Sequence, residues 1–450
     1  MGSTRHLGYQ DAWNFLDRLQ FFKIKLGLDS MHMFMESLDN PQLQFPCIHI
    51  GGTNGKGSVG ATLLSILTEA GYKVGFYTSP HLSSVRERFR IGDAFIARDE
   101  FAAQADKIIG ILNGRRITYF ELTTALALLW FAEKKVDLAI LEVGLGGRLD
   151  ATNIVTPLVS VITNVSMDHE QYLGNTLTRI AAEKAGIIKP GIPVITGARE
   201  QQALTVIADT AERLGSPLSV MGRDFSGSQP HRHTPIWSYK GIRSSLQSEL
   251  PLNMKGEHQV GNASLALAAL EIVSPSFPVS PEHLRQGLAK VHWPGRLEEF
   301  WRSPSGEITR LTAPAKTPAF HFLLDGAHNP DGALTLRKSL EKDFVYERLI
   351  LVWASMADKD IHATLMQIAP LAKVIIFTRP DEERSAKGNQ LINLLPADLQ
   401  PRAVCIDSVP LALDHAMAKY SPGSMICVAG SLYLVGRIRQ LLCGELVRDE

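Results

Sequence analysis

Residues 51–58, which read GGTNGKGS, constrain the fold of this chain more than any other segment. They follow a short apolar run at residues 46–50 and precede residues 59–70, where leucines recur at helical spacing. The sequence therefore predicts a strand, a glycine-rich loop and the start of a helix. Glycines let successive backbone N–H groups curl around an anion, and the positive end of the helix dipole points at the same place.

Lys56 adds a full positive charge that suits the outer phosphates of a nucleotide, and Ser58 or a nearby hydroxyl can reach a magnesium ion. The spacing departs from the standard P-loop, in which Ser or Thr directly follows the Lys, because Gly57 stands between Lys56 and Ser58. A glycine turn that merely joins a strand to a helix is the structural alternative. The rest of the chain has to decide between the two.

Apolar, strand-like runs alternate with helix-length segments along the chain, which predicts an α/β fold with parallel sheets. The predicted strands are residues 73–78, 137–142, 158–163, 192–196, 321–325, 349–352, 374–378, 403–406 and 425–428. We expect a P-loop-containing, mostly parallel sheet domain at residues 1–297 and a smaller Rossmann-like α/β domain at residues 298–450. The boundary lies where the pattern restarts, after the WPGR segment at residues 293–296.

Composition excludes several classes of protein. A chain of 450 residues is too long for one comfortable core. Lys plus Arg equals Asp plus Glu, at 46 each, so no overall field attracts nucleic acid or an anionic membrane. The four cysteines are scattered without metal-ligand spacing, and no apolar run reaches the length of a membrane span of about 18 residues. We expect a cytoplasmic protein with neither nucleic-acid nor membrane partners.

Two local patterns carry further expectations. Residues 9–38 have a helical pattern. Residues 83–91 contain several arginines and a glutamate, and predict an exposed segment, either a mobile lid or a solvated charged face.

Acidic, hydroxyl and imidazole groups follow the predicted strands of the first domain, where open α/β sheets bind ligands. Ser79 and Glu142 come at the ends of two strands, and His169 follows a third. Glu142 suits a magnesium ion that shares the phosphates of a nucleotide, whereas His169 alone is more typical of a structural histidine. Lys184 lies on an apolar helix, either reaching solvent or buried as a neutral, reactive amine.

Ten motifs together carry a resemblance over roughly residues 8–440. They are GTNGKGS (52–58), YTSPHL (77–82), TYFE (118–121), LEVGLGGRLDATN (141–153), MDH (167–169), EKAGIIKPG (183–191), HWPGRLE (292–298), DGAHNPDG (325–332), ADKD (357–360) and GSLYLVG (430–436). With these motifs the chain resembles the bacterial folylpolyglutamate synthase and dihydrofolate synthase family, within the Mur ligase superfamily. That family also places Gly after the P-loop Lys.

The resemblance implies that ATP is clamped between the two domains. In such enzymes the P-loop wraps the phosphates, and further nucleotide contacts come from both domains. The implied nucleotide-binding residues are Thr53, Asn54, Gly55, Lys56, Gly57, Ser58, Asn262, Arg296, Asp325 and His328.

The resemblance also implies two Mg²⁺ sites. Ser79, Glu142 and His169 correspond to the ligands of one ion, so the role first considered for Ser58 passes to Ser79. Lys184 corresponds to a lysine that is carboxylated on nitrogen in many members and helps to hold the second ion. Lys56, Glu142, His169 and Lys184 form the implied catalytic set.

The implied reaction is an ATP-dependent amide ligation. A carboxylate of dihydropteroate, or the γ-carboxylate of a tetrahydrofolate, attacks the γ-phosphate of ATP to give an acyl phosphate, and the amine of L-glutamate then displaces phosphate. The implied pteroate-binding residues are Thr118, Tyr119, Phe120, Glu121, Leu149, Asp150 and Ala151.

The form of the GGRLDATN and TYFE segments favours the bifunctional type that carries out both additions. A monofunctional folylpolyglutamate synthase and a Mur-type ligase acting on a cell-wall precursor are the alternatives within the class. From another class, a P-loop switch or binding module would hydrolyse nucleotide only to change shape, but it would not need the second α/β domain. No heptad pattern offers a dimer seam, and the family implies a monomer.

Overall fold

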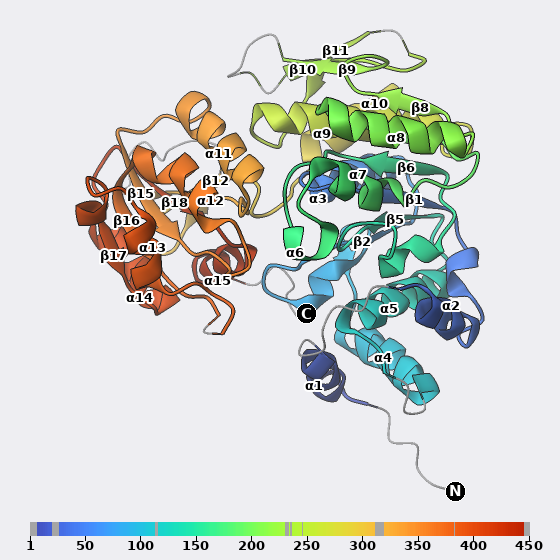
Figure 1. Ribbon diagram of the computed structural model, residues 1–450, viewed down its shortest axis with the longest axis horizontal. Coiled ribbons are helices and arrows are strands. Elements are labelled where there is room, and N and C mark those ends of the chain that lie inside the picture. Colours follow the sequence, from blue (N-terminus) through green and yellow to red (C-terminus); the bar gives the residue numbers. More distant parts are fainter. Residues whose placement is uncertain are drawn as a thin grey trace, which may run out of the picture.

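The computed structural model describes residues 7–19, 27–112, 116–229, 234, 236–244, 246–310, 319–381 and 383–444. Within these ranges the chain forms two lobes, one coloured blue to yellow and the other orange to red in Figure 1. Each lobe is built on its own sheet, and a smaller three-stranded sheet lies on the first lobe.

The first sheet has the strand order β4-β3-β2-β5-β1-β6-β7-β8. Its strands are β1 (Cys47–Gly51), β2 (Val74–Tyr77), β3 (Phe89–Ile91), β4 (Ala94–Phe95), β5 (Leu138–Glu142), β6 (Val159–Ile162), β7 (Val194–Thr196) and β8 (Leu218–Val220). All neighbouring pairs are parallel except those made by β3, which runs antiparallel to β2 and β4 at the sheet edge. The central strands are buried along their whole length because helices cover both faces.

Helices on the two faces form separate hydrophobic clusters with the sheet. One face packs against α1 (Tyr9–Leu19), α2 (Asp29–Glu36), α4 (Arg98–Leu112) and α5 (Tyr119–Lys134). The other packs against α3 (Lys56–Glu69), α9 (Glu257–Val273) and α10 (Pro281–Lys290), together with the small sheet of β9 (Ser226–Ser228), β10 (Ile236–Lys240) and β11 (Gln247–Pro251). A third cluster holds α7 (Leu177–Ala185) and α8 (Gln201–Arg213) against β6 and β7. The remaining short elements are η1 (Pro41–Leu43), η2 (Val85–Arg88), η3 (Ala151–Ile154) and α6 (Glu170–Leu173).

The second lobe has the strand order β13-β12-β14-β18-β15-β16-β17. Its strands are β12 (Glu298–Arg302), β13 (Ile308–Thr309), β14 (Phe320–Leu324), β15 (Arg348–Trp353), β16 (Ala372–Phe377), β17 (Ala403–Cys405) and β18 (Ser424–Ala429). Its helices are α11 (Pro330–Lys342), α12 (Ile361–Ile368), α13 (Gly388–Leu394), α14 (Val409–Ala418) and α15 (Leu432–Cys443), with short turns η4 (Ala369–Leu371) and η5 (Gln400–Arg402). Strands β14 to β18 pair in parallel. The predicted α/β fold class, with a P-loop sheet and a smaller second sheet, is confirmed.

Residues 9–38, which have a helical pattern, form two helices rather than one continuous helix. Helix α1 ends at Leu19, Gly27 has φ +155° and α2 begins only at Asp29, while residues 20–26 lie outside the described ranges. The left-handed backbone at Gly27 is incompatible with a continuous helix.

The prediction that residues 83–91 form an exposed segment is also wrong. Residues 85–89 are buried in η2 and the start of β3. The Glu87 carboxylate accepts hydrogen bonds from the backbone N–H groups of Leu82, Ser83 and Ser84, and Arg86 donates to the Ile96 carbonyl. These charges face the protein rather than water because the local backbone supplies their partners.

None of the helices in the described ranges is long and apolar enough to cross a membrane. Cys47, Cys405, Cys427 and Cys443 are all free thiols.

A buried polar chain lies beneath the first sheet's ligand-binding edge. His49 of β1 is fully buried, and its Nε2 lies 2.8 Å from the Thr152 hydroxyl, which donates to Asp150 Oδ1 at 2.5 Å. The Thr152 oxygen therefore accepts from His49 Nε2–H. Burial, assisted by the charge of Lys189, lowers the pKa of His49 to about 3.

The low pKa of His49 predicts that the free energy of unfolding falls in acid. His49→Gln should reduce this loss of stability. Between the folded pKa and the unfolded value of about 6.5 the unfolded state binds more protons, so the stability from neutral His49 is lost as the pH falls through that window. From about pH 7 to about pH 5 this single group should lower the free energy of unfolding by roughly 2 kcal/mol. Gln retains a donor but does not titrate. Urea unfolding at both pH values should show a smaller loss for His49→Gln than for the wild type, and an equal loss would contradict the assignment.

Candidate active site

A cavity of about 680 Å³ lies between the two lobes, at the carboxyl ends of the central strands of the first sheet. We call it the interlobe cleft. It is lined by every nucleotide-binding and metal-binding residue predicted from the sequence: Thr53, Asn54, Gly55, Lys56, Gly57, Ser58, Ser79, Glu142, His169, Lys184, Asn262, Arg296, Asp325 and His328. The structure thus brings these residues together from both lobes.

The loop between β1 and α3 depends on two glycines. Gly52 has φ +134°, and a Cβ there would lie 1.9 Å from the Thr163 hydroxyl. Gly55 has φ +88°, and a Cβ there would lie 2.5 Å from Asn262 Oδ1. Lys56 folds back and donates to the carbonyls of Gly52 and Thr53, at 3.1 Å each. The loop is therefore a compact cradle with a lysine ammonium held over it.

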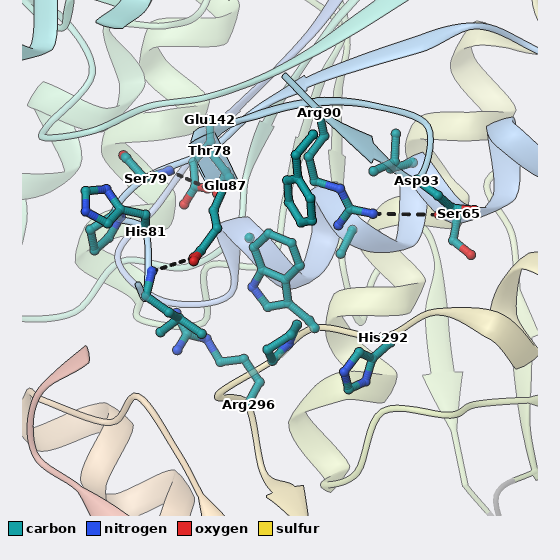
Figure 2. A pocket seen from close by; sticks show the side chains of 18 of the residues that line it. Ser65, Thr78, Ser79, His81, Glu87, Arg90, Asp93, Glu142, His292 and Arg296 are labelled. Carbon is teal, nitrogen blue, oxygen red and sulfur yellow. Dashed lines mark hydrogen bonds and ion pairs between the residues drawn. The ribbon is translucent and has the colours of Figure 1, made fainter. Parts of the chain in front are cut away.

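Glu142 ends β5 and is only 4% exposed. Its Oε2 accepts from the Thr78 hydroxyl and, at 3.4 Å, from the Ser79 backbone N–H, and Figure 2 shows these groups side by side. Burial raises the pKa of Glu142, although the charge of Lys56 and these hydrogen bonds oppose the rise. A buried carboxylate of this kind is stabilised by a cation.

Arg296 lies near acids of both lobes, Glu142 in the first and Asp325 in the second. Burial lowers the pKa of Arg296, and the negative charges of Asp325 and Glu142 oppose that effect. Gly326 makes room for the guanidinium, because a Cβ there would lie 2.0 Å from Arg296 Nη1. Asp325 itself accepts from the backbone N–H groups of Leu297 and Ala327, at 2.9 Å each.

A polar cluster around Asp168 joins the lobes on the other side of the cleft. Lys359, from the loop after β15, donates to Asp168 Oδ1 at 2.6 Å and lies 3.2 Å from His169 Nε2. Asn329 donates to Asp168 Oδ2 at 2.9 Å, and His328 Nε2 lies 3.7 Å from the same oxygen. Burial alone would raise the pKa of Asp168, but His328, His169 and Lys359 together hold it far below its usual range.

The P-loop is also hydrogen-bonded to the second lobe. Asn54 donates to Asp331 Oδ2 at 2.9 Å and exchanges hydrogen bonds with Asn329. Asn164 also donates to Asp331 Oδ2, at 3.2 Å. The start of α11 is therefore bonded directly to the phosphate-binding loop.

Lys184 lies in α7 and is 4% exposed, so the buried alternative is the one that the structure shows. Burial, assisted by the charge of Lys56, lowers the pKa of Lys184 to about 7, while Asp168 and Asp150 oppose the shift. A substantial fraction of this amine is neutral near pH 7, as reaction with CO₂ requires.

The donor set fits Mg²⁺ at one end of the cleft. Glu142 and Ser79 line the cleft and offer side-chain oxygen atoms. Oxygen donors are what Mg²⁺ prefers. The described ranges contain no group of three or more His, Cys, Asp or Glu side chains poised around one point, and His169 faces Lys359 in this structure.

The predicted pteroate-binding residues line neither the interlobe cleft nor the smaller cavity of Figure 2. Thr118 and Glu121 form a capping box at the start of α5, and Glu121 also accepts from Ser30 of α2 at 2.8 Å. Tyr119 and Phe120 pack with Ala151 in the hydrophobic cluster on that face, and Leu149 is half-buried nearby in the chain.

The Asp150 carboxylate accepts hydrogen bonds from the loop that contains it. Its two oxygens accept from the backbone N–H groups of Gly144, Leu145 and Thr152 and from the Thr152 hydroxyl. This carboxylate therefore organises the loop after β5, whose Gly144 lies against the Phe120 ring.

Sequence reasoning missed the residues that join the lobes: Asn164, Asp168, Asn329, Asp331 and Lys359. Four of them lie in or beside motifs that carried the resemblance, MDH, DGAHNPDG and ADKD, so the motifs were the available signal. No spacing rule relates residues that are 191 positions apart, as Asp168 and Lys359 are.

Comparisons with known proteins give a consistent result. The Mur ligase middle domain matches residues 50–270, and the Mur ligase glutamate ligase domain matches residues 310–432. The chain is 34% identical to the dihydrofolate synthase/folylpolyglutamate synthase of Bacillus subtilis, covering 96% of this chain and 99% of that protein.

Two solved structures extend the likeness. Escherichia coli FolC in complex with DHPP and ADP has a TM-score of 0.85 and 32% identity, covering 97% of each chain. A bifunctional folylpolyglutamate synthase/dihydrofolate synthase with Mn, AMPPNP and L-glutamate bound has a TM-score of 0.84 and 30% identity, covering 97% of this chain and 100% of that one.

Lys359→Met should destabilise the protein because it leaves the Asp168 carboxylate buried with a lost partner; the two side chains are 10% and 7% exposed. We expect a loss of about 3 kcal/mol in the free energy of unfolding, measured by urea denaturation. The double variant Asp168→Asn/Lys359→Met should lose less than the sum of the single variants. Lys373→Met, at an exposed position on β16, is the control. Additive losses would contradict the pairing.

Proposed function

The chain belongs to the dihydrofolate synthase/folylpolyglutamate synthase family of Mur ligases, and on that premise we propose that it catalyses both glutamate additions of the family. It is an ATP-dependent ligase. The proposed reactions join L-glutamate to dihydropteroate and to the γ-carboxylate of a tetrahydrofolate. The observation that carries this proposal is the interlobe cleft, where a phosphate cradle on one lobe faces an acidic and basic cluster on the other.

We propose that ATP occupies this cleft with its phosphates on residues 53–58. Asn262 lies against Gly55 and would contact the nucleotide from α9, while Arg296, Asp325 and His328 would contact it from the lobe junction and the second lobe. The relative solved with AMPPNP and L-glutamate supports a nucleotide and an amino acid as joint ligands. The nucleotide and the amino acid would together contact residues of the two lobes.

Mg²⁺ would be held by Ser79, Glu142 and His169 at one site and by N-carboxylated Lys184 at a second. When bound, the ions neutralise charge on the transferring phosphoryl group. The relative with Mn bound supports a divalent metal in this family. His169 would have to turn away from Lys359, which it contacts in this structure.

The side chains have distinct tasks in phosphoryl transfer. Lys56 and Arg296 supply positive charge where negative charge develops on the γ-phosphate. The substrate carboxylate attacks in line, ADP leaves, and the glutamate amine then attacks the acyl carbon with loss of phosphate. The hydrogen bonds between Asn54, Asn329 and Asp331 hold the lobes together while the acyl phosphate exists, which excludes water.

The pteroate group would lie against Thr118, Tyr119, Phe120 and Glu121 and the loop of Leu149, Asp150 and Ala151. The relative solved with DHPP and ADP supports a pterin substrate. Since Asp150 and Glu121 are engaged internally, we assign contact to the backbone and rings of these segments. We further propose domains at residues 1–297 and 298–450, a monomer, and a cytoplasmic location.

Incubation with ATP, labelled L-glutamate and either dihydropteroate or tetrahydrofolate tests the function directly. The wild type should form a labelled amide with each substrate, and failure with both would overturn the proposal. Lys56→Ala should lower kcat by roughly 10²- to 10³-fold because a charge on the phosphates is lost. Lys373→Ala, on the surface of the second lobe, should retain activity. Near-normal turnover by Lys56→Ala would contradict its role.

Carboxylation of Lys184 predicts a carbamate signal. With ¹³C-bicarbonate at about pH 8, where an amine with a pKa of about 7 is mostly neutral, the ¹³C spectrum should show a carbamate resonance that Lys184→Ala lacks. Added acetate should restore part of the lost activity of Lys184→Ala. Identical spectra for the two proteins would contradict carboxylation at this residue.

A further inference from the structure

A second cavity, of about 300 Å³, runs along α3 beside the interlobe cleft. We call it the helix-side cavity. Figure 2 looks into it and shows Glu142 and Arg90 in the upper part of the view and Arg296 and His292 in the lower part. Its walls are α3, the β3–β4 hairpin and the segment before β12, and include Gly57, Ser65, Arg90, Phe95, Trp293 and Arg296.

The helix-side cavity meets the interlobe cleft at the reacting centre. Gly57, Ser79, Glu142 and Arg296 line both cavities, whereas the rest of the P-loop lines only the cleft. An in-line transfer requires the attacking oxygen to approach the γ-phosphate from the side opposite the departing ADP oxygen. With ATP in the cleft, the helix-side cavity offers the attacking carboxylate that approach.

The wall of this cavity includes a cation that lacks good acceptors. The Arg90 side chain is 15% exposed, and its Nε is buried with no hydrogen-bond partner among the described residues. Its Nη2 lies 3.4 Å from the Gly92 carbonyl and 3.7 Å from Asp93, whose own side chain is 99% exposed. The guanidinium also lies 5.1 Å from the centre of the Phe95 ring.

Apart from the long contact with the exposed Asp93, neighbouring acids do not pair with Arg90. Glu87 is occupied by backbone N–H groups, and Glu142 lies at the reacting end of the cavity. Lys290, which also lines the cavity, is paired with Glu69 at 2.7 Å. A buried guanidinium retains its charge and is completed by a carboxylate, whose two oxygens match its fork of N–H donors.

The cavity can take one glutamyl residue along its wall. Two methylenes separate the glutamyl Cα from its γ-carboxylate, so the two carboxylates of one residue lie close together. A γ-carboxylate at the reacting centre beside Ser79 therefore places the methylenes along Trp293 and the α-carboxylate on the side of the cavity that Arg90 lines.

We propose that the helix-side cavity binds the glutamyl part of the folate substrate and that Arg90 pairs with its α-carboxylate. The inference rests on the proposed function. Dihydropteroate carries no glutamyl carboxylate and makes no use of Arg90. Arg90 is therefore a specificity-determining residue that favours tail extension without affecting the first addition.

Arg90→Met in the full chain tests this assignment with three acyl substrates: dihydropteroate, tetrahydrofolate, and an analogue of tetrahydrofolate with 4-aminobutyrate in place of glutamate. The analogue retains the reacting carboxylate but lacks the α-carboxylate. Arg90→Met should lower kcat/KM for tetrahydrofolate about 10- to 100-fold, as loss of a charge-assisted pair does. Dihydropteroate and the aminobutyrate analogue should change by less than about twofold. Arg213→Met, exposed at the end of α8, is the matched control.

Equal losses with all three substrates, or no loss with tetrahydrofolate, would overturn the assignment of Arg90. A wild-type chain that forms no amide from any substrate would overturn the proposed function instead. Equilibrium binding of the same three compounds to wild type and Arg90→Met, without ATP, would then still decide whether Arg90 recognises the α-carboxylate.

Discussion

The buried carboxylate of Glu142 is the constraint around which the active site is arranged. It ends the central strand β5, only 4% exposed, and its described hydrogen bonds come from neutral donors on the neighbouring strand end. Such a group is stable only as an acid or beside a cation. The nearby charges of Lys56 and Arg296 lower its pKa in part, and a divalent ion would complete the balance. The parallel strands of the sheet all end at the same edge, so the groups that bind the cation lie together there.

The second lobe contributes charged and polar side chains that bind residues of the first lobe across the cleft. Lys359, His328 and Asn329 surround Asp168, while Asp331 accepts from the P-loop's Asn54. These contacts join the phosphate-binding loop to the second lobe. Since Asp168 and Lys359 are nearly buried charges that pair across the lobes, separation of the lobes would break this pair. The geometry therefore couples assembly of the site to contact between the lobes.

The sequence predicted the layers, strand positions and cleft lining well, because glycine loops and apolar strands are local signals. It failed where the partners of a side chain are distant or supplied by backbone. The charges of residues 83–91 looked exposed, yet Glu87 is held by three backbone N–H groups. The hydrogen bonds of Asp150, a predicted pteroate contact, go to its own loop, and no spacing pattern indicates these partners. The ADKD motif marks Lys359, but nothing near it in the sequence indicates its partner Asp168, which lies on the other lobe.

The central claim is that this cleft activates a carboxylate by transferring the γ-phosphate of ATP to it. The most direct measurement follows the oxygen atom that forms the new bond. With an ¹⁸O-labelled carboxylate on dihydropteroate or tetrahydrofolate, the phosphate released with each new amide should contain one ¹⁸O atom, because the acyl phosphate gives up that oxygen when glutamate attacks. Amide formation with unlabelled phosphate would contradict the account.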